Sequence, residues 1–354
     1  MQALHTENDE DEIQRLNIAK TVHKGRASVV QKLLKQFGEE PNKPHQAVIC
    51  MDLQQTMPTP KLATGLQYYK RKMWTFNFGI HDVKKNQGFM YVWNETIGKR
   101  GSCEIASCLD HFIDNHLGPE ITKLVLFSDN CCGQNKNKNV ILSCLRKIHA
   151  NRLQSIHHYF MVPGHSYLPC DRDFVVIELK VRPVSVFTTD HYSDLIKKAN
   201  RVHPFIVIDV TRDFFKDYDI MQKEVSWAGM KDAGFINARV LIYSSNFKAG
   251  LLVQQNYGDI LPPKEVRLEK KKDKGKLNLS TFNLPSKYPG TVLLSKEKLA
   301  DLKVLMTYVD PAYKHFYTKL IEDQEEAGGG QAGMGQDRDD HYLDDDDTDD
   351  PAAL

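Results

Sequence analysis

The sequence lacks any apolar segment approaching the roughly 20 residues that are needed to span a bilayer. Its first residues, MQALHTENDEDE, are polar and acidic, and they have neither the basic end nor the apolar stretch of a secretory signal. We therefore expect a protein of the nucleus or cytosol that is neither secreted nor placed in a membrane.

Cysteine is present but lacks the patterns that would give it a structural task. The count is seven, an odd number, and no C-x-x-C pair occurs. Cys103 and Cys108 are five positions apart and Cys131 and Cys132 are adjacent, whereas zinc knuckles space their paired ligands by two to four residues. This pattern excludes a disulfide framework or a zinc knuckle and predicts reduced, mostly buried thiols.

The chain has little net charge, +1, but the charge is unevenly distributed. From Glu322 to Leu354 there are 13 acidic residues and one arginine, so this segment carries −12 and the remaining body +13. A basic body attracts polyanions, of which nucleic acid is the first candidate. The acidic end is suited to basic partner proteins or to shielding the chain's own basic surface.

Apolar patterning predicts a mixed α/β domain over residues 46–185. Buried or half-buried strands are expected at residues 47–51, 74–80, 89–93, 124–127 and 157–162. Helices are expected at 102–115, at 140–150 and from Pro169 to about Lys180. A hairpin group followed by alternating helices and strands is the order of a ribonuclease H-like mixed sheet with helices on its faces.

The flanking segments give weaker patterns. Residues 1–45 form a helical lead-in, with a helix over 10–37. Residues 186–324 predict a C-terminal α+β region with a strand at 205–210, a second small sheet from 240–243 and 251–254, and a helix after the N-cap Ser295. Residues 264–276 are lysine-rich and predict a mobile loop, and the Gly- and Asp-rich residues 325–354 predict a disordered tail.

Two carboxylates stand at the ends of predicted strands. Asp52 ends the run AVICM, and Asp129 follows LVLFS before a Gly, Gln, Asn and Lys cluster. Because ligands gather beyond the carboxyl ends of strands in α/β sheets, we expect the two carboxylates to lie within a few ångströms. Two close carboxylates repel each other unless a cation neutralises them, and hard oxygen ligands favour Mg²⁺ or Mn²⁺.

The segment GHSYLPCDRDF supplies a third acid. Asp171 lies near the start of the predicted helix, with Glu178 about two turns along the same face, while Asp173 projects elsewhere. Glu178 and Asp173 are reserve candidates. His165 is a candidate for orienting a water, binding the leaving group or ligating a metal.

Basic residues flank these acids. Lys136, Lys138 and Arg172 are candidates for contacts to phosphates. Structural alternatives remain open for the acids. Asp52 can cap a turn, Asp129 can form an Asx-turn, Asp171 can cap its helix or pair with Arg172, and His165 can be a hydrogen-bonded loop residue.

The motifs also carry a family resemblance, over about residues 10–320. MDLQQ, YYKRKMW, NFGIHD, GFMYVWNE, SDNCCGQNKN and GHSYLPCDRDF resemble those of transposon-derived arthropod and invertebrate proteins with a ribonuclease H-like DDE/D core. The chain is similar to the Kyakuja–Dileera–Zisupton transposases. This resemblance implies that Asp52, Asp129 and Asp171 are the first, second and third catalytic acids, holding two metal ions.

The resulting expectation is a transposase-derived, metal-dependent nuclease or polynucleotidyl transferase that acts on DNA, domesticated or truncated, with a homo-oligomer as a further expectation. The rival is a catalytically inactive nucleic-acid-binding or chromatin-associated protein. An intact set of three acids favours the first, and the absence of Cys/His-rich DNA-binding elements before the core favours the second.

Overall fold

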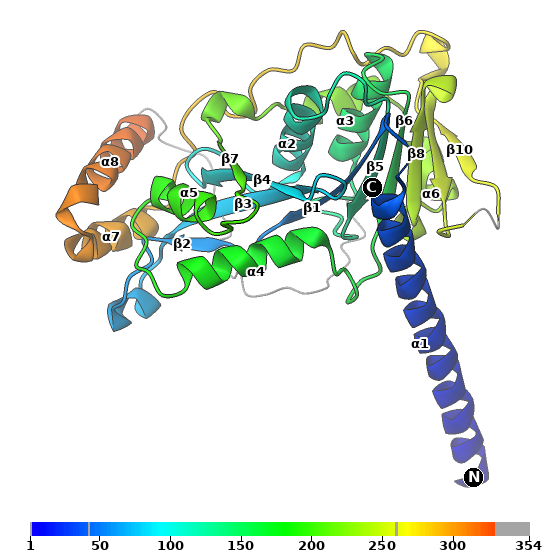
Figure 1. Cartoon of the computed structure of the whole chain (residues 1–354), viewed down its shortest axis with the longest axis horizontal. Coiled ribbons are helices and arrows are strands. Elements are labelled where there is room, and N and C mark those ends of the chain that lie inside the picture. The colour runs from blue at the N-terminus through cyan, green and yellow to red at the C-terminus, as the bar shows by residue number, and fades with distance from the viewer. Residues whose placement is uncertain (1, 42, 259–260, 330–354) are drawn as a thin grey trace.

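The computed structural model describes residues 2–41, 43–258 and 261–329. The chain folds as an α/β protein around a ten-stranded mixed sheet with helices on both faces (Figure 1). The α/β fold class predicted from the sequence, a mixed sheet flanked by helices, is therefore confirmed.

The strands are β1 (Gln46–Leu53), β2 (Met57–Thr59), β3 (Met73–Asp82), β4 (Gln87–Asn94), β5 (Lys123–Ser128), β6 (Ser155–Phe160), β7 (Ile206–Asp209), β8 (Val240–Ser244), β9 (Gly250–Gln254) and β10 (Lys264–Arg267). The helices are α1 (Gln2–Glu39), α2 (Ser102–Asn115), α3 (Lys138–His149), α4 (Pro169–Val181), α5 (Thr189–Lys197), α6 (Ala228–Asp232), α7 (Lys296–Leu305) and α8 (Lys314–Gly329).

The centre of the sheet has the strand order β4-β3-β1-β5-β6. β3 pairs antiparallel with both β1 and β4, whereas β5 lies parallel to β1 and β6 parallel to β5. β1 and β5 therefore run side by side in one direction, and their carboxyl ends meet at one edge of the sheet. This is the hairpin group followed by α/β alternation that the sequence predicts.

The region after residue 185 extends this same sheet. β7 adds in parallel to β4, and β8 pairs antiparallel with β6 and continues through β9 to β10. The predicted second small sheet is thus wrong, because β8 covers the open edge of β6, whose backbone N–H and C=O groups need partners. The predicted mobile loop at 264–276 is also wrong at its start, where β10 pairs with β9 and buries Val266.

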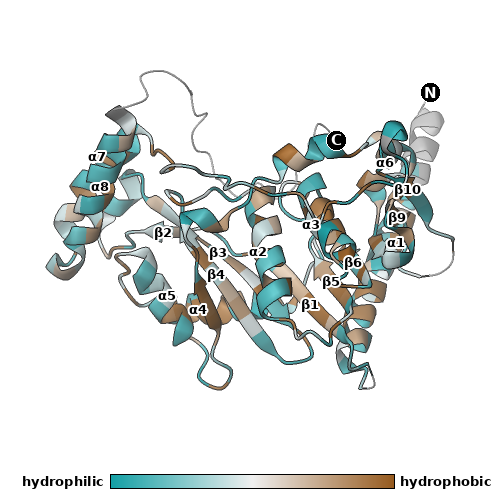
Figure 2. Cartoon of the chain, turned by 90° about the horizontal axis from the view of Figure 1, so that it is seen from above, coloured by the Kyte–Doolittle hydropathy of each residue, from teal (hydrophilic) through white to brown (hydrophobic). Residues whose placement is uncertain are grey.

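Each face of the sheet has its own apolar core. Alternation along β1 sends Ala47, Ile49 and Met51 into the core shared with α2 and α3, and Val48 and Cys50 into the core shared with α1 and α4. In Figure 2 the central strands are mostly hydrophobic, and the helices around them carry hydrophilic surfaces. By the same alternation Asp52 lies on the α4 face.

α1 is longer than the predicted helix at residues 10–37. Its last turns pack on the body through Ala27, Val30 and Leu34, while most of residues 12–26 are exposed. Figure 1 shows this helix projecting away from the sheet. Among the described residues, no helix is both long enough and apolar enough to cross a membrane.

The C-terminal part of the described chain is helical. Ser295 caps α7 as predicted, its hydroxyl accepting from the Lys298 N–H at 3.2 Å. α8 continues to Gly329, so the disorder predicted from residue 325 is wrong for 325–329, where the helix continues from a face that buries Tyr317, Leu320 and Gln324. The remaining acidic tail, residues 330–354, lies outside the described residues, and so do its predicted partners.

Candidate metal centre

Asp52 is the penultimate residue of β1 and lies on the face of the sheet that α4 covers. It is half-buried, and its Oδ1 accepts a hydrogen bond of 2.8 Å from the backbone N–H of Leu53. Its partner in the neighbouring strand β3 is Gly79. The strand thus carries the carboxyl to the sheet edge and the local backbone fixes one of its oxygens.

Asp129 directly follows β5, the strand parallel to β1. Its Oδ1 accepts from the Cys131 N–H at 3.2 Å and from the side-chain amide of Asn135. The first of these bonds is the Asx-turn that the sequence left open, so Asp129 shapes its loop. Because the amide and the turn hold the same oxygen, the carboxyl has a fixed orientation.

Asp171 lies in the first turn of α4. Its Oδ2 accepts from the Leu168 N–H at 2.7 Å, so Asp171 does cap its helix. The charge and side chain of Asp171 also act to raise the pKa of Asp52, so the two carboxyls interact. Asp171 therefore caps α4 and also lies close enough to Asp52 to affect its pKa.

The three carboxyls form one electrostatic cluster. Burial raises the pKa of Asp52 well above its usual range, and the charges of Asp129 and Asp171 raise it further. Burial also raises the pKa of Asp129, against the opposing hydrogen bonds from Asn135 and Cys131, and that of Asp171, against the bond from Leu168. The hydrogen bonds that hold these groups come from neutral N–H donors, which leaves a concentration of negative charge suited to a cation.

The donor set fits Mg²⁺ or Mn²⁺ by chemistry, since it consists of hard carboxylate oxygens. Its spacing is wider than that of a single tight site. Ligand atoms of Asp52, Asp129 and Asp171 do not all fall within 4.8 Å of one another, a spacing that only Cys103, Asp217 and Asp219 meet among the described residues. Asp52 is the central member, because the charges of both Asp129 and Asp171 raise its pKa.

The tighter group of Cys103, Asp217 and Asp219 already holds a cation. The Lys287 ammonium donates to Asp217 Oδ1 at 2.9 Å and to Asp219 Oδ2 at 2.6 Å. Burial acts to raise the pKa of Asp219, but the bonds from Lys287 and Asn139 outweigh it and lower that pKa. Burial raises the pKa of the Cys103 thiol to about 12. A protonated thiol and a bound ammonium make this a structural cluster.

His165 lies in the loop between β6 and α4, where it meets α1. Its ring packs against His23 of α1, with ring centroids 5.2 Å apart, and its backbone N–H donates to Val162 O. His23 and Gln31 also bind the carbonyls of Pro163 and Tyr167, so α1 supports the loop that leads to Asp171. These contacts place His165 against α1, and its role toward a metal or a water stays a prediction.

The two reserve acids lie elsewhere on α4. Asp173 is buried and its Oδ2 pairs with Nδ1 of His81 in β3 at 2.7 Å. The prediction of Asp173 as a third ligand is wrong, because this carboxylate is already engaged across the helix–sheet interface. Glu178 is exposed and lines a hollow of about 250 Å³ together with Gln54, Gln55 and Arg182. The carboxyl of Glu178 thus lines this hollow, about two turns along α4 from Asp171.

The three predicted phosphate contacts have different environments. Lys136 is 1% exposed and donates to Asn130 Oδ1, Ile236 O and Ala238 O at 2.6–3.0 Å. Its prediction as a nucleic-acid contact is wrong, because the ammonium is buried against main-chain carbonyls. Lys138 is half-buried over the ring of Trp227, and Arg172 is exposed beside Asp171.

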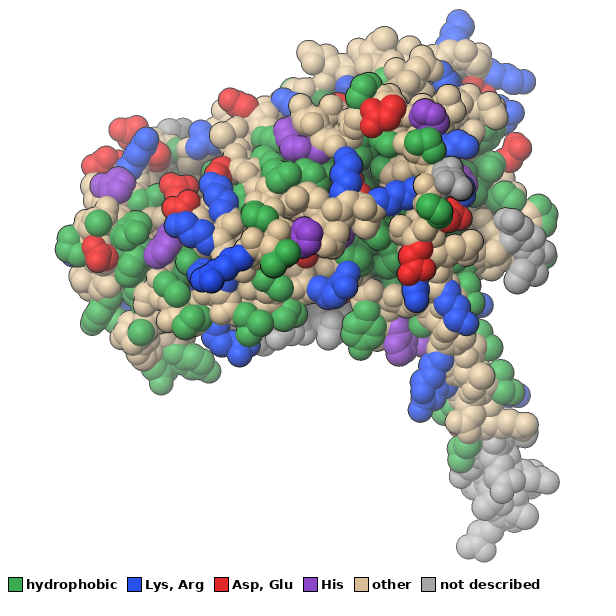
Figure 3. All heavy atoms as spheres, in the orientation of Figure 1, with side chains coloured by type: hydrophobic (Ala, Val, Ile, Leu, Met, Phe, Trp, Pro, Cys, Tyr) green, Lys and Arg blue, Asp and Glu red, His purple; other side chains and the backbone are tan. Residues whose placement is uncertain are grey.

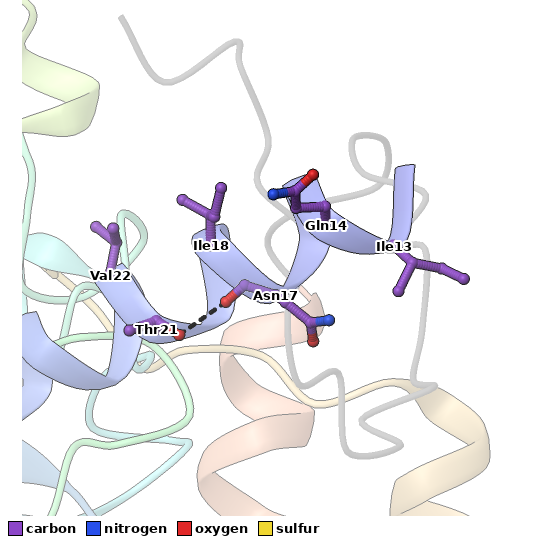
Figure 4. A pocket seen from close by; sticks show the side chains of 6 residues that line it. All are labelled: Ile13, Gln14, Asn17, Ile18, Thr21 and Val22. Carbon is purple, nitrogen blue, oxygen red and sulfur yellow. Dashed lines mark hydrogen bonds between the residues drawn. The ribbon is translucent and has the colours of Figure 1, made fainter. Parts of the chain in front are cut away.

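A second hollow lies on α1, away from the carboxylates. Figure 4 shows that it is one face of the projecting helix, lined by Ile13, Gln14, Asn17, Ile18, Thr21 and Val22. The only hydrogen bond drawn within it joins Thr21 Oγ1 to the carbonyl of Asn17, at 2.8 Å. It offers no chemistry that bears on the acids.

Three contributors to the site were missed from the sequence. Asn135 orients Asp129, Gly79 gives α4 close access to β3, and His81 ties α4 to the sheet. Asn135 could have been found, because it follows Asp129 by six positions in the polar loop. Gly79 and His81 depend on the strand pairing and could not.

Comparison with known families gives one match. A domain of unknown function (DUF7869) is similar to residues 68–225. The matched segment contains Asp129 and Asp171 and begins after Asp52. Neither a curated protein nor a solved structure matches the chain.

Proposed function

We propose that the protein is a transposase-derived, metal-dependent nuclease or polynucleotidyl transferase that acts on DNA in the nucleus. The observation that carries the proposal is the convergence of three half-buried carboxyls, two from the ends of parallel strands and one from the first turn of α4, each with a pKa raised by burial. The basic character of the body supports a polyanionic substrate.

Asp52, Asp129 and Asp171 are the residues that would hold two Mg²⁺ or Mn²⁺ ions. Such ions, when bound, stabilise the attacking and leaving oxygens in phosphodiester cleavage. The chain itself fixes the ligands. One oxygen of each carboxyl is anchored by the N–H of Leu53, Cys131 or Leu168, so the other is oriented without a large loss of side-chain freedom.

The test is a calorimetric titration of Mn²⁺ into the wild-type chain and into Asp52→Asn and Asp129→Asn. We expect binding by the wild type and at least a tenfold loss in each variant, because each substitution removes a charged ligand. Nuclease assays with Mn²⁺ and labelled DNA follow, in which Asp52→Asn should abolish cleavage while the far-ultraviolet circular dichroism stays unchanged.

Asp217→Asn is the matched control, since it removes a carboxylate from the cluster that holds Lys287. It should bind Mn²⁺ as the wild type does. Loss of binding in Asp217→Asn together with wild-type affinity in Asp52→Asn would place the metal in the other cluster and refute the proposal.

Two observations favour the rival function, a catalytically inactive nucleic-acid-binding or chromatin-associated protein. The three acids stand farther apart than the ligands of one tight ion, and Asp171 also serves as a helix cap. DNA binding without Mn²⁺-dependent cleavage in the same assays would support this alternative.

A further inference from the structure

Two neighbouring tyrosines stand almost fully in solvent. Tyr68 is 84% exposed and Tyr69 is 81% exposed, on the short 3-10 helix η1 (Gly65–Tyr69). Their rings meet edge to face with centroids 5.3 Å apart. Apolar packing does not explain them, because each ring presents most of its surface to water.

The segment that carries them is firmly held. Thr64 caps η1 by accepting from the Leu66 N–H, and the Leu62 N–H donates to the Gln67 side chain. After the tyrosines, Asp301 of α7 accepts from the Arg71 N–H at 3.1 Å and from Lys70 Nζ at 2.9 Å. Two exposed rings on an anchored backbone form a preorganised platform, which lowers the entropy lost on binding.

The platform lies in a basic setting. Lys70, Arg71 and Lys72 follow the tyrosines directly, and Asp301 neutralises part of this charge. Arg172 is exposed on α4, and Arg182 is exposed directly after its last residue. Figure 3 shows Lys and Arg side chains over the face on which Figure 1 places α4. Stacking surfaces next to cations are the combination that binds the bases and phosphates of single-stranded nucleic acid.

α4 connects the platform to the carboxylates. Asp171 lies in its first turn, and at its other end the Lys61 ammonium binds the carbonyls of Val181, Arg182 and Val184 at 2.7–2.9 Å. Lys61 starts the loop that leads to Tyr68. The 13 residues of α4 span about 20 Å at 1.5 Å per residue. A strand extended along this helix would reach both features.

We propose that Tyr68 and Tyr69 stack on unpaired bases of a single-stranded segment of nucleic acid whose backbone follows α4 to the carboxylates. The choice of nucleic acid as the substrate class rests on the proposed function. The stacking itself requires no metal and no cleavage, so the two proposals can fail separately.

The experiment measures fluorescence anisotropy of a labelled 30-nucleotide single strand and of the matching duplex, in EDTA, at one fixed salt concentration. The full chain is compared with the double variants Tyr68→Ala/Tyr69→Ala and Tyr68→Phe/Tyr69→Phe. Tyr308→Ala is the matched control, because Tyr308 is also exposed but ends the 3-10 helix η7 (Met306–Tyr308), with no basic run after it. Circular dichroism verifies that every variant is folded.

We expect the alanine pair to weaken single-strand binding by about tenfold or more, because both stacking faces are lost. Duplex binding should change by less than about twofold, and the phenylalanine pair, which keeps the rings, should bind as the wild type does. Wild-type affinity in the alanine pair, an equal loss for duplex and single strand, or no single-strand binding by the wild type would each overturn the proposal. Titration of Mn²⁺ into the alanine pair tests separately whether the metal site is intact.

Discussion

The ring of Phe174 fills the space in which a side chain at Gly79 would stand. A Cβ at Gly79 would lie 2.7 Å from Cε1 of Phe174, closer than side-chain carbons approach each other. Gly79 is also the residue paired with Asp52 across β1 and β3, and Phe174 is one turn beyond Asp171 on α4. The glycine therefore sets how closely the third acid approaches the first.

Gly79→Ala should push α4 away from β3 and separate Asp171 from Asp52. We expect a loss of about 1–3 kcal/mol in the free energy of unfolding from overpacking. Affinity for Mn²⁺ should fall by roughly tenfold, as for other changes that displace a ligand. Urea unfolding and calorimetry measure the two effects.

Gly290→Ala is the control, because a Cβ there meets no atom within 4 Å. The second-site variant Phe174→Leu, combined with Gly79→Ala, makes room for the new methyl group and should recover part of the Mn²⁺ affinity. If Gly79→Ala binds Mn²⁺ like the wild type, α4 does not control the position of Asp171.

The raised pKa values predict how the metal-free protein responds to pH. Burial raises the pKa of Asp52 in the folded state above its unfolded value, so between the two the folded chain holds a proton that the unfolded chain has lost. Stability then falls as the pH rises through that window. Asp52→Asn cannot ionise and should be more stable than the wild type at pH 8, by on the order of 1 kcal/mol.

Urea unfolding in EDTA at pH 4, 6 and 8 provides the measurement. The gap between Asp52→Asn and the wild type should widen with pH, and saturating Mn²⁺ should reverse it, because the ion stabilises only the intact site. Asp232→Asn, at an exposed position, should show no such gap. A gap that stays constant from pH 4 to 8 would contradict a raised pKa at Asp52.

The central sheet could be predicted from local patterning because its strands are nearly continuous apolar runs and its helices have clear starts. The predicted helix at 102–115 agrees with α2, and the strand at 124–127 lies within β5. The edges could not be predicted. Whether β8 pairs with β6 or forms its own sheet depends on contacts between residues about 80 positions apart, which periodicity does not record.

The placement of Asp52 and Asp129 on neighbouring strand ends followed from one general rule, that carboxyl ends of parallel strands meet, whereas Asp171 lies on a helix. The burial of the flanking basic residues could not be predicted in this way. Lys136 and Lys138 are two positions apart in the same polar loop and helix start, yet one is buried and the other half-buried. Direction of a side chain in a loop depends on the backbone path, which the sequence leaves undetermined.

His165→Ala should leave Mn²⁺ affinity within about twofold of the wild type, because the contact of its ring is with His23 of α1. The melting temperature should fall slightly, since the contact with α1 is lost. Calorimetry and thermal unfolding measure the pair of effects, with His23→Ala as the reciprocal control. A tenfold loss of Mn²⁺ affinity in His165→Ala alone would restore the ligand role that the sequence suggested.

Substitutions of Lys136 and Lys138 should have different effects: the first should lower stability, and the second should lower nucleic-acid affinity. Lys136→Met leaves the carbonyls of Ile236 and Ala238 without their donor and should cost about 2–4 kcal/mol of unfolding free energy. Lys138→Gln should cost at most about 1 kcal/mol, through its contact with the Trp227 ring, and should lower DNA affinity with a salt slope smaller by about one. Binding measured across a salt series, beside urea unfolding, distinguishes the two. If Lys136→Met is as stable as the wild type and reduces the salt slope of DNA binding, then the Lys136 ammonium contacts DNA. The buried position of Lys136 would then not be its position in the DNA complex.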